Sequence, residues 1–233
     1  MDNAARTRRR VLALFLPLAA VLYISAEALS PKGTDQVATD KATALKLLAI
    51  AAKHPTQLYI AGTCAVLGLG ALAVSYAAIA TLARDSGSGL ATVAALIGGI
   101  GAFCGAIVNV LVFPNLAAAA TAHTTPGAAA QFLVTTFNSG FGHGFEYAYF
   151  LGIYAAPLLM GLALWRSRAV PRWLAVLFVI GLYVAESQSS GEAIVVLYML
   201  PFAAAMVLLA ARIWPAAALP ASQPQLEPAG VPV

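Results

Sequence analysis

The sequence predicts an all-α fold, a polytopic bundle of about six transmembrane helices with both termini in the cytoplasm. The first observation is composition: 61% of the 233 residues are hydrophobic and only 9% are charged, against about 25% charged residues in an ordinary soluble domain. The second is length, because several apolar runs approach the ~20 residues that cross a bilayer core as a helix. We expect one transmembrane domain over residues 1–214 and a disordered Pro- and Ala-rich tail over residues 215–233.

The third observation is the distribution of positive charge. All nine arginines fall at the termini or in predicted loops, and these loops alternate with the one loop that holds all four lysines. The positive-inside rule assigns the arginine face to the cytoplasm, as in a bacterial plasma membrane. The formal net charge of +4 therefore reflects topology, and we expect no nucleic-acid partner. The expected partners are the lipid bilayer and a lipophilic small molecule, whereas the oligomeric state stays open.

The predicted spans follow the apolar runs in chain order. They cover residues 11–29, 58–82, 90–112, 143–165, 173–187 and 192–214. The first run follows a basic cluster, as a signal peptide would, but Pro17 and Glu27 interrupt it and no convincing cleavage site follows. We therefore interpret it as a retained helix.

The connection over residues 30–54 is the longest polar one. From Asp40 onward its pattern predicts a short helix on the outer membrane surface, with Leu45, Leu48 and Ala52 on one face. A solvated loop is the alternative interpretation.

Glycine residues indicate a helix contact and a helix break in the middle of the chain. Gly98, Gly101 and Gly105 have the spacing of a close helix contact within the third span. Residues 114–131 carry no formal charge and form either a re-entrant or a surface segment. The run over residues 131–165 is too long for one span, so we divide it at the Gly-rich FNSGFGHG and expect a short helix before the fourth span.

The stretch from Phe137 to Tyr154 concentrates polar and aromatic residues in an otherwise aliphatic chain. On a helix, one face carries His143, Glu146, Tyr147, Phe150 and Tyr154. A His and a Glu at this spacing can also ligate a metal. A metal site requires more donors than this pair, so we expect neither a metal nor another cofactor and interpret His143 as a partner of Glu146.

The predicted topology places the acidic residues of the spans at one depth, toward the outer leaflet. These are Glu27, Glu146, Glu186 and Glu192. Ionised carboxylates are costly at membrane depth, so such residues face the bundle interior and mark function by default. The alternative is that those at span ends reach headgroups or water. We expect one outward-facing polar pocket, with Glu146 as the first candidate acid.

Aromatic side chains around a proton-donating carboxyl suit a carbocation reaction, because ring faces stabilise positive charge. Aromatic belts at membrane interfaces are the alternative explanation. The candidate acids are Glu146, Glu27 and Glu186. The candidate substrate contacts are His143, Asn109, Phe141, Phe145, Tyr147, Phe150, Tyr154, Tyr183 and Glu192.

In length, number of spans and pairing of membrane-embedded acids with aromatics, the chain resembles small integral-membrane terpene cyclases, namely the fungal meroterpenoid cyclases and the bacterial indole-sesquiterpene cyclases of the drimentine type. The resemblance lies in the layout and not in a motif. It implies a metal-independent class II-type cyclase that protonates an alkene or epoxide of a prenyl chain. The runs EALSPKGTD and KHPTQLYIAG also resemble uncharacterised actinobacterial membrane proteins, which implies no activity. The competing expectation is a transporter or sensor.

Overall fold

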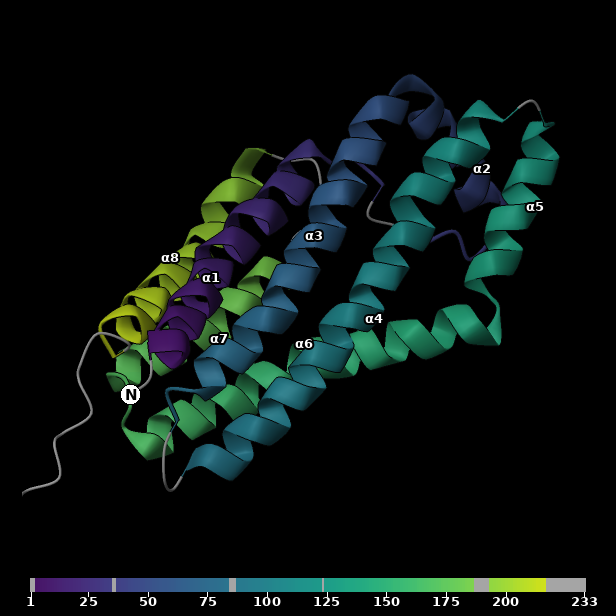
Figure 1. Ribbon diagram of the computed structural model, residues 1–233. Helices are drawn as coiled ribbons and strands as arrows, with labels where there is room; N and C mark the ends of the chain where they lie inside the picture. The colour runs from purple at the N-terminus through teal and green to yellow at the C-terminus, as the bar shows by residue number, and fades with distance from the viewer. Residues whose placement is uncertain (1–2, 35–36, 84–86, 123, 187–192, 217–233) are drawn as a thin grey trace, which may run out of the picture.

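The computed structural model describes residues 3–34, 37–83, 87–122, 124–186 and 193–216, and every regular element in these residues is a helix (Figure 1). The helices are α1 (Asn3–Leu29), α2 (Lys41–Lys53), α3 (Pro55–Ala80), α4 (Ser88–Thr121), α5 (Pro126–Phe137), α6 (Gly140–Ser167), α7 (Arg172–Glu186) and α8 (Ala193–Ala216). The predicted all-α class is confirmed. The predicted tail lies outside the described residues from position 217 onward.

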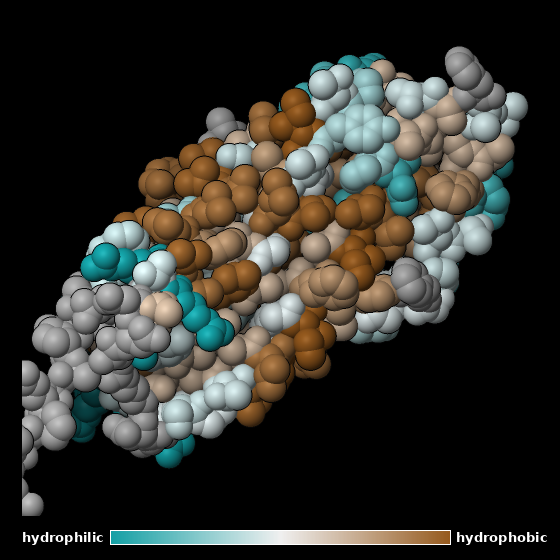
Figure 2. Space-filling model, in the orientation of Figure 1, coloured by the Kyte–Doolittle hydropathy of each residue, from teal (hydrophilic) through white to brown (hydrophobic). Residues whose placement is uncertain are grey.

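Within the described part of the chain, five helices are long and apolar enough to cross a membrane, namely α1, α3, α4, α6 and α8. The expected fifth span corresponds to α7, which has only 15 residues and therefore extends about 22 Å, less than the ~30 Å of a bilayer core. α7 nevertheless packs against both α6 and α8. In Figure 2, hydrophobic residues cover the middle of the molecule and hydrophilic ones gather toward its two ends.

Arginines from distant segments meet at one end of the bundle. The Arg10 guanidinium lies over the Trp214 ring, with its Cζ 5.6 Å from the ring centroid, so the start of α1 and the end of α8 are neighbours. Arg172 lies in the same way over Trp165, at 5.0 Å, where α6 turns into α7. Arginines that were predicted to share one side of the membrane therefore lie at one end of the helix bundle.

The glycines of α4 act as the helix contacts that their spacing predicts. A Cβ on Gly101 would overlap the Cα of Gly152, so the backbones of α4 and α6 touch. Gly98 faces the ring of Tyr76 on α3, and Gly105 faces the ring of Tyr149 on α6. Small residues permit this close approach in a bilayer, where helices associate through van der Waals packing.

Capping residues explain where the shorter helices begin. The Asp40 carboxylate accepts the backbone N–H of Thr43 at the start of α2, and the Ser139 hydroxyl accepts the N–H of Gly142 at the start of α6. Both side chains satisfy backbone donors that a helix N-terminus leaves free. The break between α5 and α6 falls within FNSGFGHG, as predicted.

α4 extends beyond the predicted third span. It continues through Pro114 to Thr121, and its 34 residues extend about 51 Å. α2 and α5 pack around the extension in a second hydrophobic cluster (Figure 1). The region expected as one re-entrant or surface segment is therefore the end of α4, a short turn and the beginning of α5. Apolar burial against two neighbouring helices accounts for the longer α4.

The predicted surface helix exists as α2, and the face that it buries against protein differs from the face predicted to lie on the membrane. Leu48 is buried, whereas Leu45 and Ala52 are exposed. The buried residues are Ala44, Leu47, Leu48 and Ala51. α2 packs against α4 and α5, so its buried side faces protein, and these neighbours could not be identified from the pattern of α2 alone.

Candidate functional site

The Glu186 carboxyl, at the last residue of α7, joins three helices. The Tyr23 hydroxyl of α1 donates a hydrogen bond to its Oε1, and the Tyr149 hydroxyl of α6 donates to its Oε2 at 3.1 Å. The Glu186 side chain is partly buried, and Tyr23 is only 7% exposed. We call Tyr23, Tyr149 and Glu186 the Glu186 cluster.

Packing holds both phenols of the Glu186 cluster in place. The Tyr23 ring meets the Phe202 ring of α8 edge-on, with centroids 6.2 Å apart. The Tyr149 ring occupies space that a Cβ on Gly105 would fill. The small residue on α4 therefore lets Tyr149 approach the core, and packing fixes the positions of both donors.

Glu27 is the second acid at this site. It lies one helical turn after Tyr23 on α1, and its carboxyl interacts electrostatically with that of Glu186. Two carboxylates that interact in this way repel each other when both are ionised. The site therefore combines two acids with two phenols.

Glu146, the first candidate acid, belongs to a different interaction. His143 Nδ1 lies 3.5 Å from Glu146 Oε2, as their spacing predicts, and the two side chains are 43% and 31% exposed. Tyr147, on the same side of α6, is 72% exposed. The partners of Glu186 are Tyr23 and Tyr149, so the two acids are held by separate sets of residues.

Four aromatic rings form a row along the seam between α6 and α7. Tyr149 contacts Phe150, Phe150 stacks with Tyr154, and Tyr154 stacks with Tyr183 at a centroid distance of 5.7 Å. The Tyr183 hydroxyl donates to the backbone carbonyl of Tyr154. Three predicted substrate contacts, Phe150, Tyr154 and Tyr183, therefore lie together, and Tyr149 connects them to the Glu186 cluster.

The other predicted substrate contacts are Asn109, Phe141, Phe145 and Glu192. The Asn109 side chain donates to the Gly105 carbonyl of its own helix at 2.9 Å. Phe145 is partly buried on α6. The Phe141 side chain and the whole of Glu192 lie outside what the structure describes. The expected single pocket thus becomes one pair of acids, Glu27 and Glu186, and a separate His143–Glu146 pair.

Sequence reasoning missed Tyr23 and Tyr149, although each had a signal. Tyr23 precedes Glu27 by four residues, so the two side chains share a helix face. Tyr149 lies within the aromatic stretch, on the side of α6 that faces Gly105. Neither signal identifies Glu186 as the common acceptor, because that requires the positions of three helices.

An apolar groove of about 290 Å³ continues the seam toward the arginine end. Gly161 of α6 opens it, because a Cβ there would overlap Val179 of α7. Its other lining residues are Leu158, Leu162, Trp165, Ala175, Val176 and Ile180. Leu158 lies one turn after Tyr154 and Ile180 one turn before Tyr183, so the groove begins next to the aromatic row.

Among the described residues, no three His, Cys, Asp or Glu side chains come together. His143 and Glu146 supply two donors between them.

Residues 11–219 match the sequence profile of a family described as a domain of unknown function (DUF4386). The match covers nearly all of the described bundle, including every residue of the Glu186 cluster. No curated protein and no solved structure matches the chain.

Proposed function

The chain belongs to the DUF4386 family, and we propose that it is an enzyme of the bacterial plasma membrane in which Glu186 protonates a lipophilic, prenyl-type substrate, as in a class II-type terpene cyclase. The observation that supports this most is the Glu186 carboxyl, held between two phenols from other membrane helices. Glu186 replaces Glu146 as the first candidate because the Glu146 side chain is 31% exposed beside His143.

The proposed reaction begins with proton transfer. The O–H bond of the Glu186 carboxylic acid breaks, and its proton forms a C–H bond with an alkene carbon or protonates an epoxide oxygen. The remaining carboxylate is stabilised by hydrogen bonds from Tyr23 and Tyr149. The substrate carries the positive charge through ring closure. A proton then leaves carbon and returns to the Glu186 carboxylate, directly or through water, which restores the acid, so no oxidant or reductant is required.

Aromatic rings near the acid are suited to the cationic intermediate. The rings of Tyr23 and Phe202 meet edge-on, and Phe150 lies 5.7 Å from Tyr149. A cation within about 6 Å of such a ring centroid is stabilised by about 0.5–2 kcal/mol, with the larger values at desolvated sites. The phenols thus have two proposed roles, as donors to the carboxylate and as neighbours of the carbocation.

The seam groove gives the proposed substrate a place to bind. Its lining is almost entirely apolar, which suits the hydrocarbon of a prenyl chain. The aromatic row lies between the groove and Glu186. Rotation of Tyr154 or Tyr183 would connect the two, and we expect substrate binding to require it.

The test uses membranes that contain the wild-type protein, the Glu186→Gln variant or the Glu146→Gln variant. Prenylated indoles and prenylated diketopiperazines are the substrates, and mass spectrometry with chromatography detects cyclised isomers. We expect product from the wild type and from Glu146→Gln, and none from Glu186→Gln. Absence of product from the wild type would overturn the cyclase proposal, and equal loss in both variants would overturn the choice of acid.

A proton-linked transporter or sensor is the second candidate, and one observation favours it. Each oxygen of Glu186 holds a phenol from a different helix, so a change in protonation alters how α7 is joined to α1 and α6. In proteoliposomes with an internal pH dye, this function predicts proton uptake that Glu186→Gln abolishes. A catalysing protein that moves no protons across the bilayer excludes it.

A further inference from the structure

Tyr76 of α3 places a hydroxyl group in the hydrophobic core. The residue is 2% exposed, and its ring meets Phe178 of α7 edge-on with centroids 6.2 Å apart. Gly98 of α4 provides the space on the other side, because a Cβ there would lie 2.6 Å from the ring. The ring is therefore held firmly, and the position of its hydroxyl follows from the packing.

No atom of the described residues forms a hydrogen bond with this hydroxyl. Buried polar groups in folded proteins almost always have a partner, and an unpaired one is destabilising. Phenylalanine would fill the same space without that penalty. A tyrosine at this position therefore points to a partner that the described side chains do not supply.

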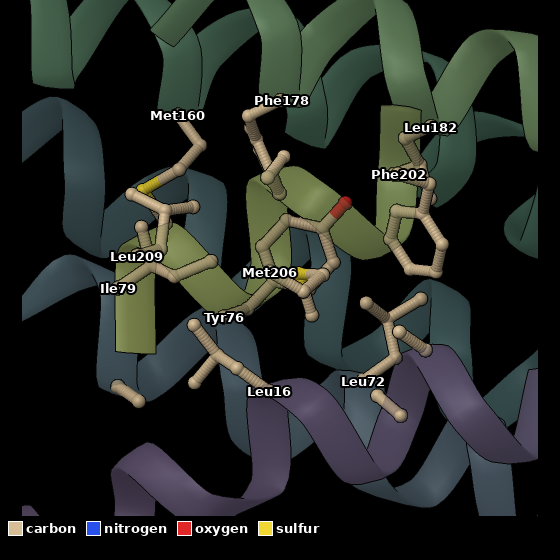
Figure 3. Close-up of a cluster of buried hydrophobic side chains, with 14 of the residues drawn as sticks. Leu16, Leu72, Tyr76, Ile79, Met160, Phe178, Leu182, Phe202, Met206 and Leu209 are labelled. Atoms are coloured by element: carbon tan, nitrogen blue, oxygen red, sulfur yellow. The ribbon is translucent and has the colours of Figure 1, made fainter. Parts of the chain in front are cut away.

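The direction of the hydroxyl identifies the side from which a partner must come. In Figure 3 the Tyr76 oxygen points toward α7, near Leu182 and Phe202, and away from Leu16 of α1. Glu186 follows Leu182 by one turn of α7, and its carboxyl interacts electrostatically with the Tyr76 hydroxyl. A carboxylate oxygen that accepts one phenol has a second lone pair, so Glu186 can accept one more donor.

We propose that Tyr76 is a third phenol of the Glu186 cluster, joined to the carboxyl by one buried water molecule. The water accepts a hydrogen bond from the Tyr76 hydroxyl and donates one to a Glu186 oxygen. Buried waters occupy such places, between polar groups that would otherwise be unpaired. The inference rests on the proposed proton role of Glu186 and extends its site toward the arginine end of the bundle.

Thermal unfolding in nanodiscs tests the hydrogen bond without any assay of activity. We expect Tyr76→Phe to lower the unfolding midpoint by about 2–4 °C, whereas an unpartnered hydroxyl predicts an unchanged or higher midpoint. Tyr198→Phe is the matched control, because Tyr198 is 44% exposed on α8; it should leave the midpoint unchanged. An unchanged or raised midpoint in Tyr76→Phe overturns the proposal.

The link to Glu186 is tested by a double-mutant cycle with Glu186→Met, which removes the acceptor. We expect the effect of Tyr76→Phe to disappear in that background, and additive effects would overturn the link. If the double variant does not fold, infrared spectra in H₂¹⁶O and H₂¹⁸O replace the cycle. The wild type should show an isotope-sensitive band of one buried water that Tyr76→Phe lacks, and a wild type without this band overturns the water. If the cyclase assay fails, the unfolding and infrared measurements still test the hydrogen bond and the water at Tyr76, because neither depends on enzymatic activity.

Discussion

Glu186 and Glu146 are two acids of the same helix bundle, but they differ in their partners. Glu146 pairs with His143, three residues away on its own helix, and is 31% exposed. Glu186 accepts hydrogen bonds from Tyr23 and Tyr149, which lie 163 and 37 residues away in sequence. The His143–Glu146 pair, which stands out in the sequence, lies on the outside of α6. Glu186, which joins three helices, lies at the end of α7, where the sequence pattern does not mark it.

The energetic consequences of the two arrangements also differ. A partly exposed contact between a histidine and a carboxylate contributes little, because solvent takes over the interactions of both side chains when it is broken. The Tyr23 hydroxyl has no such alternative, because its residue is 7% exposed. Loss of its acceptor leaves a buried donor unpaired. The comparison therefore predicts that stability depends on Glu186 much more than on Glu146.

Replacement of each acid by leucine is the strongest test of this difference. Glu186→Leu should destabilise the protein by about 2–4 kcal/mol, because two phenol donors lose their acceptor. Glu146→Leu should change the free energy of unfolding by less than about 0.5 kcal/mol. Reversible unfolding in mixed micelles measures both. Equal effects would mean that the two acids are not distinguished by burial.

The glycine behind Tyr149 provides the second test. Gly105→Ala should destabilise by about 1–3 kcal/mol, because the new methyl group overlaps the Tyr149 ring and displaces it from Glu186. Gly99→Ala is the control on the same helix, since no atom lies within 4 Å of a Cβ built there. The control should be neutral or slightly stabilising. Loss of stability in Gly99→Ala would show that α4 tolerates no added methyl group, whatever its neighbours.

Removal of single hydroxyls sharpens the comparison further. Tyr149→Phe deletes the donor to Glu186 Oε2 and should cost about 1 kcal/mol. Tyr147→Phe, two residues away on the exposed side of α6, should have no measurable effect. Thermal denaturation of the two variants in one lipid composition gives the difference. A neutral Tyr149→Phe would remove the main support for the Glu186 cluster.

Asp40 is a water-exposed acid with which Glu186 and Glu146 can be compared. The pH dependence that it gives to α2 is the smallest effect that we expect. The backbone N–H and the side chain of Thr43 donate to its carboxylate and hold the pKa of Asp40 below its usual value. Because its pKa is lower in the folded protein, the Asp40 carboxylate stabilises the fold at pH values above the unfolded-state pKa of about 3.9. This stabilisation is lost as the pH falls through the folded pKa. Hydrogen exchange of α2 amides should therefore accelerate, relative to the Asp40→Asn variant, only below about pH 4.

Several features of the fold followed from local sequence. The break at FNSGFGHG became the junction of α5 and α6 because Ser139 caps the new helix. The contact role of Gly101 followed from its small size and apolar setting. The extent of α4 beyond residue 112 did not follow, because Pro114 suggested an end. Packing against α2 and α5 continues the helix to Thr121.

The sequence by itself determined the membrane class, the arginine end, the break between α5 and α6 and the His143–Glu146 pair, because each depends on composition or on spacing within one segment. Only the tertiary structure decided which acid receives the phenols. That choice depends on the rotation and relative depth of α1, α6 and α7, and a helix pattern does not contain these quantities. Tyr23 and Glu186 are 163 residues apart and become neighbours because the intervening helices pack them at the same end of the bundle.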